Sequence, residues 1–356
     1  MLINNIELKN FRNYKEEIIE FDKDINVIYG DNAQGKTNIL ESIFIGAFGK
    51  SYRTSKDREL INKDESFANL LIRYENKDRS NKIEIKLLDD NKKSILLNGV
   101  KIKKLSDLLG KLNVVLFTPD DINILKDSPQ YRRRFLDMMI GQIKPNYIYN
   151  LNLYKNVLEE RNNYLKDSKY NKNEDLLEIY NKKLTDYAEI VYKYREEYIN
   201  KIKTIISEIH SKITENKEDI RIEYVSDFKN KEDFLKLLDK SKDNDYYRGF
   251  TTKGIHRDDF VIYINNEDVS TYGSQGQNRT VILTLKLCEL NIIKEEIGEN
   301  PVLLLDDFMS ELDEKRRLNF LKNIDNIQVI ITCTDKFEKE KFNFINIEKG
   351  KIKKES

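Results

Sequence analysis

Apolar and polar residues tend to alternate along residues 2–29 and again along residues 70–97. A period of two is typical of β-strands that bury one face. Asn98-Gly99 ends the second stretch, and this dipeptide is a strong signal for a tight hairpin turn. The first third of the chain is therefore predicted to be rich in strands, with one helix over residues 38–48.

The hydrophobic period changes in the middle of the chain. From Pro129, a residue suited to the first turn of a helix, to about Asn216, Leu and Tyr recur at helical spacing among Lys, Glu and Asn. This block predicts several helices inserted in an α/β domain, and the charged segments 165–175 and 226–245 are expected to be solvated loops or helix faces. Further strands are predicted at 114–117, 220–225, 260–264, 302–305 and 328–332, the last of these being the final strand, and a further helix at 277–296.

Charge and composition narrow the possible partners only slightly. The chain has 356 residues, with Lys+Arg equal to Asp+Glu at 62 each, so a polyanion must be met by a local basic patch rather than by a basic body. Cys288 and Cys333 stand far apart, and only two histidines are available as further ligands, so we expect a reduced chain without structural zinc. No apolar stretch approaches the roughly 20 residues of a membrane span, and the first residues lack a signal peptide, so we expect a cytoplasmic protein.

A glycine-rich loop follows the apolar run at residues 24–29 and precedes the predicted helix. Its pattern is G-x-x-x-x-G-K-[ST], in which backbone N–H groups wrap phosphates, Lys36 reaches the β and γ oxygens and Thr37 can bind Mg²⁺. The alternative, a plain turn, does not account for the strand before the loop and the helix after it. The residues predicted to bind nucleotide here are Gly30, Asp31, Asn32, Ala33, Gln34, Gly35, Lys36, Thr37 and Asn38.

A second candidate element is the apolar strand 302–305, which ends in Asp306 and Asp307. Adjacent carboxylates at a strand end can address a metal and a nucleophile separately, so we assign Asp306 to Mg²⁺ and Asp307 to the attacking water. Lys36, Asp306 and Asp307 are then the predicted catalytic residues. Alone, this pattern is also that of an ordinary boundary between a strand and a turn.

The third element is a Ser-x-Gly-Gln turn at a helix start, with Ser274, Gly276 and Gln277 as its candidate residues. A hydroxyl and exposed N–H groups at a helix N-terminus form an anion site suited to a γ-phosphate, here of a nucleotide held by another subunit. The alternative is that Ser274 only caps the helix and the glycine allows the bend.

These elements in this order, followed by Ser310-Glu311-Leu312-Asp313, resemble the ABC-type ATPase heads of the SMC and Rad50 class. More closely, the chain resembles the RecF family of bacterial recombinational repair proteins along nearly its whole length. The segments that carry this resemblance are Phe11-Arg12-Asn13-Tyr14, GDNAQGKTNILESI, Tyr52-Arg53-Thr54, residues 119–137 with Arg132-Arg133, Gly254-Ile255-His256-Arg257-Asp258-Asp259, GSQGQNRT and LLLDDFMSELD.

The resemblance implies an ATPase head with a β-rich N-terminal part and an inserted helical lobe. It places the ATP-binding lobe at residues 1–120 and 297–356 and the helical lobe with the signature turn at 121–296. It further implies an ATP-dependent head-to-head dimer, with residues 310–313 as the D-loop. Such a dimer binds single- and double-stranded DNA at gaps, hydrolyses ATP, and acts with RecO and RecR so that RecA is loaded, in DNA replication, DNA repair and the SOS response.

Several positions depart from the pattern of ABC heads or of this family. Asp307 stands where ABC heads commonly have Glu, and the shorter side chain leads us to expect slow hydrolysis. Ala33 replaces a frequent glycine and Ile255 replaces a proline, and both changes are expected to be benign. We identify neither a Q-loop glutamine nor a switch histidine after residues 332–334, so the γ-phosphate sensor is open.

Basic clusters and His256 have two readings each. The clusters can contact DNA phosphates or be solvated faces, and Arg132 and Arg133 can also pair with Asp120, Asp121 or Asp137 in a core or hinge. His256 is either a satisfied structural histidine or a residue near the dimer interface. The clusters are Lys50, Arg53, Lys56 and Arg58; Lys101, Lys103 and Lys104; and Arg132, Arg133 and Arg134.

Three other classes of protein share some of these motifs. A nucleotide-binding subunit of an ABC-type machine with a non-DNA partner, such as a transporter, shares all three, but its signature lies nearer to the phosphate loop. An SMC head requires long heptad arms, for which residues 129–216 are too few. A small-molecule kinase has the phosphate loop but gives no role to Ser274-Gln275-Gly276-Gln277.

Overall fold

In the computed structural model, the chain forms two compact units. Unit 1 contains Met1–Asp121 and Glu289–Ser356, and unit 2 contains Ile122–Cys288. The sequence places the second boundary at residues 296/297, whereas the contacts divide the chain within a helix, α8 (Gln275–Ile297), which passes from unit 2 into unit 1. The structure describes all residues except 78, 91, 168–172, 308–325, 335–341 and 354–356.

The first sheet of unit 1 is antiparallel and has six strands in the order β2-β1-β4-β5-β6-β7. The predicted turn at Asn98-Gly99 joins β6 to β7, and both residues have positive φ (51° and 82°), as a tight hairpin of this type requires. The strands are β1 (Leu2–Phe11), β2 (Tyr14–Glu20), β4 (Phe67–Asn76), β5 (Arg79–Leu88), β6 (Lys93–Leu97) and β7 (Val100–Lys101).

The second sheet of unit 1 has the order β15-β14-β3-β13-β12-β8 and is parallel except for β15. Its central strands are buried apolar runs, as a parallel sheet covered on both faces requires. The strands are β3 (Ile25–Tyr29), β8 (Val114–Phe117), β12 (Val302–Leu305), β13 (Val329–Cys333), β14 (Asn343–Glu348) and β15 (Lys351–Lys353).

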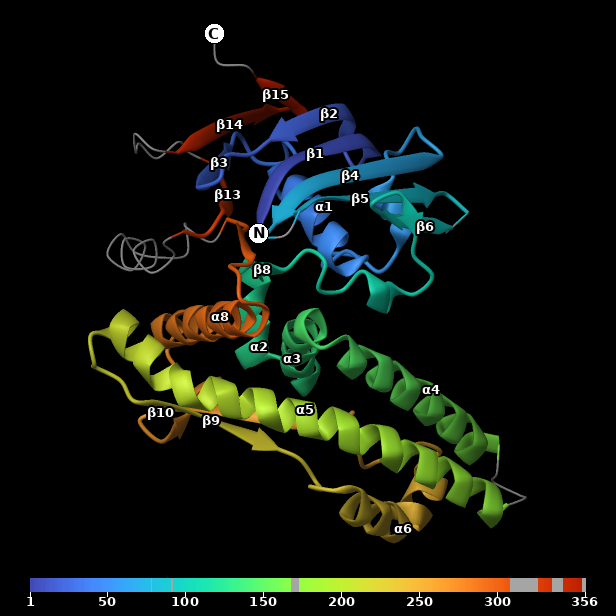
Figure 1. Ribbon diagram of the computed structural model, residues 1–356. Helices are drawn as coiled ribbons and strands as arrows, with labels where there is room; N and C mark the ends of the chain where they lie inside the picture. The colour runs from blue at the N-terminus through green and yellow to red at the C-terminus, as the bar shows by residue number, and fades with distance from the viewer. Residues whose placement is uncertain (78, 91, 168–172, 308–325, 335–341, 354–356) are drawn as a thin grey trace. The chain divides into compact units, whose positions relative to one another are not determined.

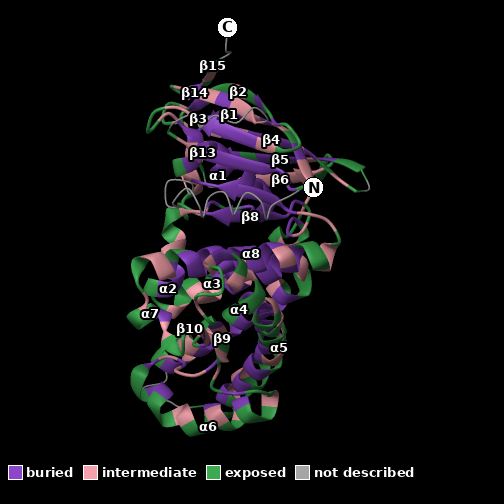
Figure 2. Cartoon of the chain, turned by 90° about the vertical axis from the view of Figure 1, so that its left-hand side faces the viewer, coloured by how far each residue is buried: buried purple, intermediate pink, exposed green. Residues whose placement is uncertain are grey.

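Helix α1 (Lys36–Phe48) contacts strands of both sheets and is buried along nearly its whole length (Figures 1 and 2). A helix buried on all sides has no polar face, and residues 43–48 are accordingly apolar or glycine, while the buried polar residues Glu41 and Ser42 are hydrogen-bonded. Three short 3₁₀ helices complete unit 1 and the junction: η1 (Asp57–Leu60), η2 (Leu105–Asp107) and η3 (Pro119–Ile122).

Unit 2 is built on α5, a helix of 41 residues that lies beside α4 (Figure 1). Its length is about 60 Å at 1.5 Å per residue, far short of the arms of an SMC protein. A small antiparallel sheet, β11-β10-β9, packs on α5. The elements of unit 2 are α2 (Asn123–Lys126), α3 (Pro129–Ile143), α4 (Pro145–Asp167), α5 (Glu174–Thr214), β9 (Ile220–Val225), α6 (Lys231–Arg248), β10 (Asp259–Ile264), β11 (Glu267–Asp268) and α7 (Val269–Tyr272), followed by α8.

One sequence prediction of an element requires correction. The final strand is not residues 328–332, since β14 and β15 follow it. Their short apolar alternation, Phe344, Ile345 and Ile347, stands among Asn, Glu and Lys, which weakened the signal, and the Lys349-Gly350 turn between them has positive φ at both residues. The charged stretch 226–245 is largely α6, which agrees with the predicted helix face: Phe234 and Leu238 are buried, and the charged residues other than the buried Asp245 are exposed or half-buried (Figure 2).

Candidate functional site

The glycine-rich loop joins β3 to α1 in unit 1, and its backbone geometry demands its residue types. Gly30 and Gly35 have φ of 145° and 114°, and Ala33 adopts the left-handed region with φ of 64°. A Cβ at Gly30 would lie 2.3 Å from the backbone oxygen of Ile347, and one at Gly35 would lie 2.6 Å from Asn13 Nδ2. Both glycines are therefore required by the packing of the loop and by its φ angles.

Two segments distant in the sequence hold the loop at Gln34. Asn13 Nδ2 donates to the Gln34 backbone oxygen at 2.8 Å, and the Gly350 amide donates to the same oxygen at 3.1 Å. The Lys349 amide donates to Gln34 Oε1 at 2.5 Å. The turn after β1 and the β14–β15 hairpin thus buttress the loop, and the second of these supports was not predicted from the sequence.

The start of α1 is anchored by Glu41, which is fully buried. Arg12 binds it in a bidentate ion pair, with Nε and Nη2 at 2.9 and 2.7 Å from the two carboxylate oxygens. Arg53 Nη1 donates to Glu41 at 3.2 Å and to Asn38 Oδ1 at 2.8 Å. Two of the segments that resemble the RecF family therefore brace the helix whose N-terminus faces the loop.

Lys36 folds back over the loop that precedes it. Its Nζ donates to the backbone oxygens of Gly30 and Asp31 at 2.6 and 2.9 Å, and the residue is only 5% exposed. An ammonium group held by carbonyl oxygens is a cation poised for an anionic ligand.

Asp306, at the end of β12, lies within hydrogen-bonding distance of three hydroxyl groups. Thr37 Oγ1 and Thr332 Oγ1 are each 2.9 Å from Asp306 Oδ1, and the Tyr52 hydroxyl donates to Oδ2 at 3.1 Å. Strand β13, which carries Thr332, lies between β3 and β12 in the sheet. The phosphate-loop threonine and the strand-end aspartate are therefore brought together although 269 residues separate them in sequence.

Tyr52 and Thr332 were not predicted as site residues. Burial, followed by the Asp306 charge, raises the pKa of Tyr52 well above its ordinary value, so Tyr52 stays a hydrogen-bond donor at every physiological pH. The only signal for Tyr52 was the family resemblance of Tyr52-Arg53-Thr54, and Thr332 was noted only as the end of the predicted strand 328–332. Neither spacing reveals a contact with Asp306.

Asp307 has an unusual backbone conformation and a perturbed carboxyl. Its φ is 46°, and its amide donates to Thr332 Oγ1 at 3.0 Å. Burial and then the adjacent Asp306 charge raise the pKa of Asp307, while Lys36 lowers it. A raised pKa makes the carboxylate a stronger base than an ordinary aspartate.

The donor atoms around Thr37 and Asp306 suit a small hard cation. Mg²⁺ binds hydroxyl and carboxylate oxygens and keeps several waters, so one carboxylate and one hydroxyl suffice beside phosphate oxygens. Within the described residues there is no group of three or more His, Cys, Asp and Glu side chains that would hold a metal alone. These residues therefore fit a metal that arrives with a nucleotide.

The signature turn of unit 2 is a capping box. Ser274 Oγ accepts from the Gln277 amide at 3.2 Å, and Gln277 Oε1 accepts from the Ser274 amide at 2.9 Å. The capping alternative is thus what the structure shows, yet it leaves the hydroxyl hydrogen of Ser274 available to an anion, since a hydroxyl accepts and donates. Gly276 follows in the first turn of α8, and Ser274 is exposed.

Arg132 and Arg133 are committed to pairs inside unit 2. Arg132 Nε and Nη2 bind the two oxygens of Asp259 at 2.6 and 3.0 Å, and Arg133 Nη1 donates to the backbone oxygen of Asp258 at 2.8 Å. The partner of Arg132 is therefore Asp259 rather than Asp120, Asp121 or Asp137. Of the two readings of this double arginine, the core role is supported.

Asp258 is the centre of a buried network. It accepts from Tyr224 at 2.5 Å, from Ser226 at 2.7 Å and from Arg195 at 3.3 Å, and Arg195 also donates to Asp137 at 3.0 Å. Arg195 and Asp258 are each 2% exposed. Burial raises the pKa of Asp258, against the effect of Arg195 and the hydroxyl donors.

His256 is a satisfied structural histidine. Nε2 lies 3.1 Å from the Thr251 backbone oxygen and Nδ1 lies 2.7 Å from the Tyr154 hydroxyl. Because a carbonyl only accepts, the proton is assigned to Nε2, and Nδ1 accepts from Tyr154. Burial lowers the pKa of His256 to about 4. Ile255 is fully buried beside it, in the place where a proline was expected.

Three further expectations concern the D-loop, the cysteines and membrane-spanning helices. The D-loop, Ser310 to Asp313, lies outside the described residues. Cys288 and Cys333 are free cysteines. Among the described helices, none is long and apolar enough to cross a membrane.

An ABC-type ATPase head is defined by four features of this chain: the phosphate loop after β3, the acid strand β12 within the same parallel sheet, the antiparallel sheet of unit 1 and the helical insertion. A family model described as the RecF/RecN/SMC N-terminal domain matches residues 2–351. An SMC head domain from Pyrococcus furiosus has a TM-score of 0.58 at 21% identity, covering 99% of this chain and 95% of that one, which supports the fold alone.

More similar proteins narrow the family. The chain is 47% identical to a DNA replication and repair protein RecF from Clostridium kluyveri and 45% identical to one from Clostridium beijerinckii, over 99% of this chain in both cases and 99% and 98% of the relatives. A structure of the recombination mediator protein RecF with ATP, in the RecFOR pathway, has a TM-score of 0.95 at 39% identity, covering 100% of this chain and 98% of that one. The chain belongs to the RecF family of DNA replication and repair proteins.

Proposed function

We propose that this chain is an ATP-dependent DNA-binding protein of recombinational repair and replication, with slow ATPase activity, whose phosphate loop binds ATP. Lys36 would release the carbonyl oxygens of Gly30 and Asp31 and bind the β and γ oxygens, while the backbone amides of residues 30–38 and the N-terminus of α1 wrap the phosphates. This exchange favours a triphosphate because it replaces neutral acceptors with charged ones.

Mg²⁺ would be held by Thr37 Oγ1 and Asp306, and when bound it neutralises charge on the phosphates. Tyr52 and Thr332 keep the Asp306 carboxylate oriented through their hydroxyl groups. Asp307 accepts a proton from the attacking water, for which its raised pKa suits it. Its side chain is one methylene shorter than that of Glu, so it reaches the water less well and hydrolysis is slow.

ATP would join two copies of the chain head to head. Ser274 and Gly276 at the N-terminus of α8 reach the γ-phosphate held by the partner, and Gln277 belongs to the same turn. The support is chemical: the Ser274 hydroxyl retains a hydrogen to donate, and α8 directs the positive end of a long helix at the turn. Residues 310–313 would bridge the two sites.

DNA would be bound by the closed dimer, with exposed lysines of unit 1 as the phosphate contacts. Lys56, Lys101 and Lys103 are exposed, whereas Arg132 and Arg133 are engaged within unit 2. A neutral chain presents only a weak basic surface, so joining two copies strengthens binding to gapped single- and double-stranded DNA. The family's association with the RecFOR pathway leads us to propose RecO and RecR as partners and RecA loading as the outcome.

The contact between Thr37 and Asp306 is the observation that carries this proposal. It joins the loop and the acid strand into one site whose oxygens suit Mg²⁺ and whose neighbour, Lys36, suits phosphate. A plain turn or an ordinary strand end would have no need of it.

The test is binding of the purified chain to a gapped duplex at fixed salt, without nucleotide, with ADP and with ATP. Lys36→Arg and Ser274→Arg are measured in parallel, together with ATP binding by each variant. Tight DNA binding only with ATP, lost in Ser274→Arg although that variant still binds ATP, is the expected result. Binding that ignores nucleotide, or no binding, would mean that the ATPase acts on a partner other than DNA.

A further inference from the structure

Glu218 ties the signature turn of unit 2 to a buried histidine. Gln277 Nε2 donates to Glu218 Oε1 at 3.0 Å, and Glu218 Oε2 lies 3.3 Å from His210 Nε2. His210 lies on α5 with 0% exposure, and its Nδ1 is 2.9 Å from Thr284 Oγ1 on α8. The contacts therefore run from the middle of α8, through α5 and Glu218, back to the first turn of α8.

The contacts of Thr284 decide which nitrogen of His210 carries the proton. Burial lowers the pKa of His210, although the Glu218 charge opposes this, so the neutral imidazole is the form to assign. The Thr284 hydroxyl donates to the Thr280 backbone oxygen at 2.8 Å, so it accepts from Nδ1–H of the neutral His210 ring, and Nε2 lies 3.3 Å from Glu218 without a hydrogen bond among the described residues. Glu218 is therefore held by the hydrogen bond from Gln277 Nε2 and lies beside the His210 ring.

Gln277 is engaged at both ends of its amide. Its Oε1 accepts from the Ser274 backbone amide at 2.9 Å, while its Nε2 reaches Glu218. A glutamine with one end free would sample several rotamers and close the capping box only part of the time, because side-chain ordering costs free energy. Glu218 therefore favours the rotamer that closes the turn.

We propose that Glu218, which lies beside His210 and accepts from Gln277, is a positioning residue for the signature turn. It fixes Gln277, and so keeps Ser274 and the N-terminus of α8 preformed for the phosphate of a nucleotide bound to a second copy of the chain. Gln277 acts in this arrangement through the turn rather than by touching the phosphate. The inference rests on the proposed ATP-dependent dimer and names the residues that prepare its surface.

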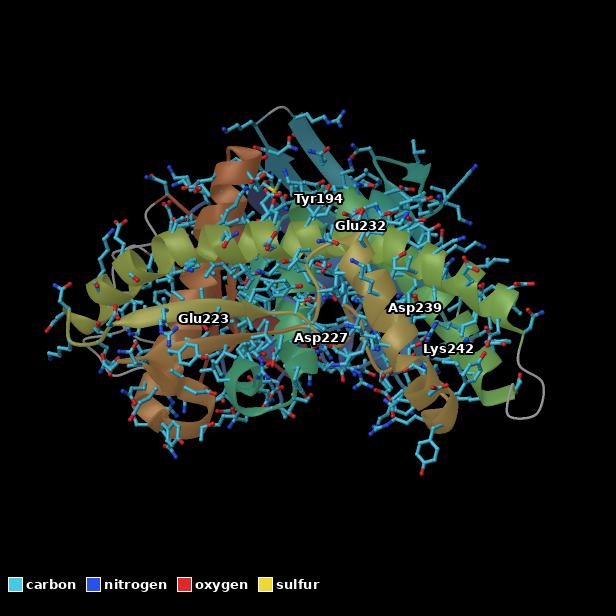
Figure 3. The ribbon with its side chains drawn as sticks, turned by 90° about the horizontal axis from the view of Figure 1, so that it is seen from below. Tyr194, Glu223, Asp227, Glu232, Asp239 and Lys242 are labelled. Carbon is cyan, nitrogen blue, oxygen red and sulfur yellow. The ribbon has the colours of Figure 1, made fainter. Side chains whose placement is uncertain are left out.

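The test compares ATP-dependent dimerisation, measured by light scattering over a range of protein concentrations, in Glu218→Ala, Glu218→Gln and Glu223→Ala. Glu223 is the matched control, because it lies on β9 (Figure 3), loses the same charge and pairs with Arg221 rather than with Gln277. Glu218→Ala should dimerise about tenfold more weakly, as expected for a lost hydrogen bond to a charged group. Glu218→Gln keeps an oxygen for Gln277 and should stay within about threefold of the parent.

Two further readouts separate positioning from a general loss of structure. Hydrogen exchange at the Ser274 and Gln277 amides should speed up in Glu218→Ala, and ATP affinity at protein concentrations below dimerisation should not change, since the phosphate loop lies in unit 1. If Glu218 served only stability, Glu218→Ala would lower the melting temperature, and hydrogen exchange at this turn would speed up only as much as in the rest of α8. If Glu218→Ala does not purify as a folded protein, Glu218→Met is used with the same expectations.

Dimerisation and turn exchange equal to the parent in the Glu218 variants would overturn the proposal. A parent chain that binds ATP but stays monomeric would instead contradict the proposed function. In that case the exchange measurement still decides whether Glu218 holds the turn.

Discussion

Two charged regions of this protein, the phosphate loop in unit 1 and the Arg195–Asp258 network in unit 2, differ in the groups that their charges contact. Around the phosphate loop of unit 1, Lys36 is held by neutral carbonyl oxygens, which an anionic ligand can replace, and burial and the Asp306 charge raise the pKa of Asp307. In unit 2, Arg195 and Asp258 are buried and face one another within a closed set of donors. Both regions contain motifs that resemble the RecF family, yet one is arranged to bind and the other to hold the fold.

The difference shows that the presence of a family motif does not reveal whether its residues bind a ligand or hold the fold. The Arg132-Arg133 and Asp258-Asp259 segments also carry the family resemblance, but they contact one another, Arg132 through the Asp259 carboxylate and Arg133 through the Asp258 backbone oxygen. Charged side chains that are fully paired inside a fold have little left to offer a ligand. Perturbing each region should therefore change a different property of the protein.

The largest effect is expected at the open region, from Asp307→Asn. The variant loses the group that accepts a proton, so ATP hydrolysis should fall by about a thousandfold while ATP binding and the ATP-bound dimer persist. Turnover by phosphate release and dimerisation by light scattering check this. A variant that is monomeric with ATP and Mg²⁺ would contradict it.

The same residue makes a prediction about pH. Hydrolysis requires the Asp307 carboxylate, and the raised pKa means that it becomes protonated at a higher pH than an ordinary aspartate. As pH falls, the rate of the parent should decline through this pKa, and the limb should be absent from the residual rate of Asp307→Asn. A rate that declines only through the ordinary pKa of aspartate would argue against burial at this position.

At the closed region, Arg195→Met should lower the free energy of unfolding by about 3 to 4 kcal/mol, because Asp258 and Asp137 lose a buried cationic partner. Denaturant unfolding measures the change. Lys182→Ala is the matched control on the same helix, since its pair with Glu178 is exposed and contributes little. ATP affinity should be unchanged as long as the variant is folded. A large loss of ATP affinity would contradict the assignment of Arg195 to the stability of the fold alone.

A smaller effect concerns His256, whose pKa is lowered to about 4 by burial. The unfolded chain binds this proton near pH 6.5, whereas the folded chain does so only near pH 4. Stability is therefore complete above pH 6.5 and falls as the pH drops between these values, by up to about 3 kcal/mol. His256→Asn should have a flatter stability profile in this interval, and unchanged slopes would refute the assignment.

The smallest effect is expected from Tyr52→Phe, which removes one hydrogen bond to Asp306. The Mg²⁺ concentration needed for half-maximal ATP binding should rise about fivefold, in line with about 1 kcal/mol for a hydrogen bond. Tyr74→Phe, at another buried tyrosine of unit 1, serves as the control and should leave this concentration unchanged. An equal response of both variants would assign the change to packing.

The sequence predicted best what depends on neighbouring residues. The phosphate loop, the acid strand and the Asn98-Gly99 turn follow from local backbone geometry, which residue types reveal directly. The roles of Tyr52 and Thr332 around Asp306 depend on strand order, and the support of Gln34 by Lys349 and Gly350 depends on a hairpin more than 300 residues away. No local pattern encodes such contacts.

Electrostatic partners were predicted less well for the same reason. Arg132 has several acidic residues nearby in sequence, and proximity favoured Asp120, Asp121 and Asp137, but the fold selects Asp259, which is 127 residues away. The capping box at Ser274 and Gln277 is a local pattern and was available as an alternative. Its connection to Glu218 and His210 appears only when α5 and α8 are packed together.

The support of the loop by the β14–β15 hairpin has a consequence for how the protein is made. Gly30 and Gly35 are translated early, whereas Lys349 and Gly350, whose amides hold Gln34, are translated more than 300 residues later. Contacts so far apart form late in folding, because the intervening chain must first be ordered. A nascent chain therefore carries an unfinished phosphate loop, and its competence to take up nucleotide arises only when translation of this hairpin is complete.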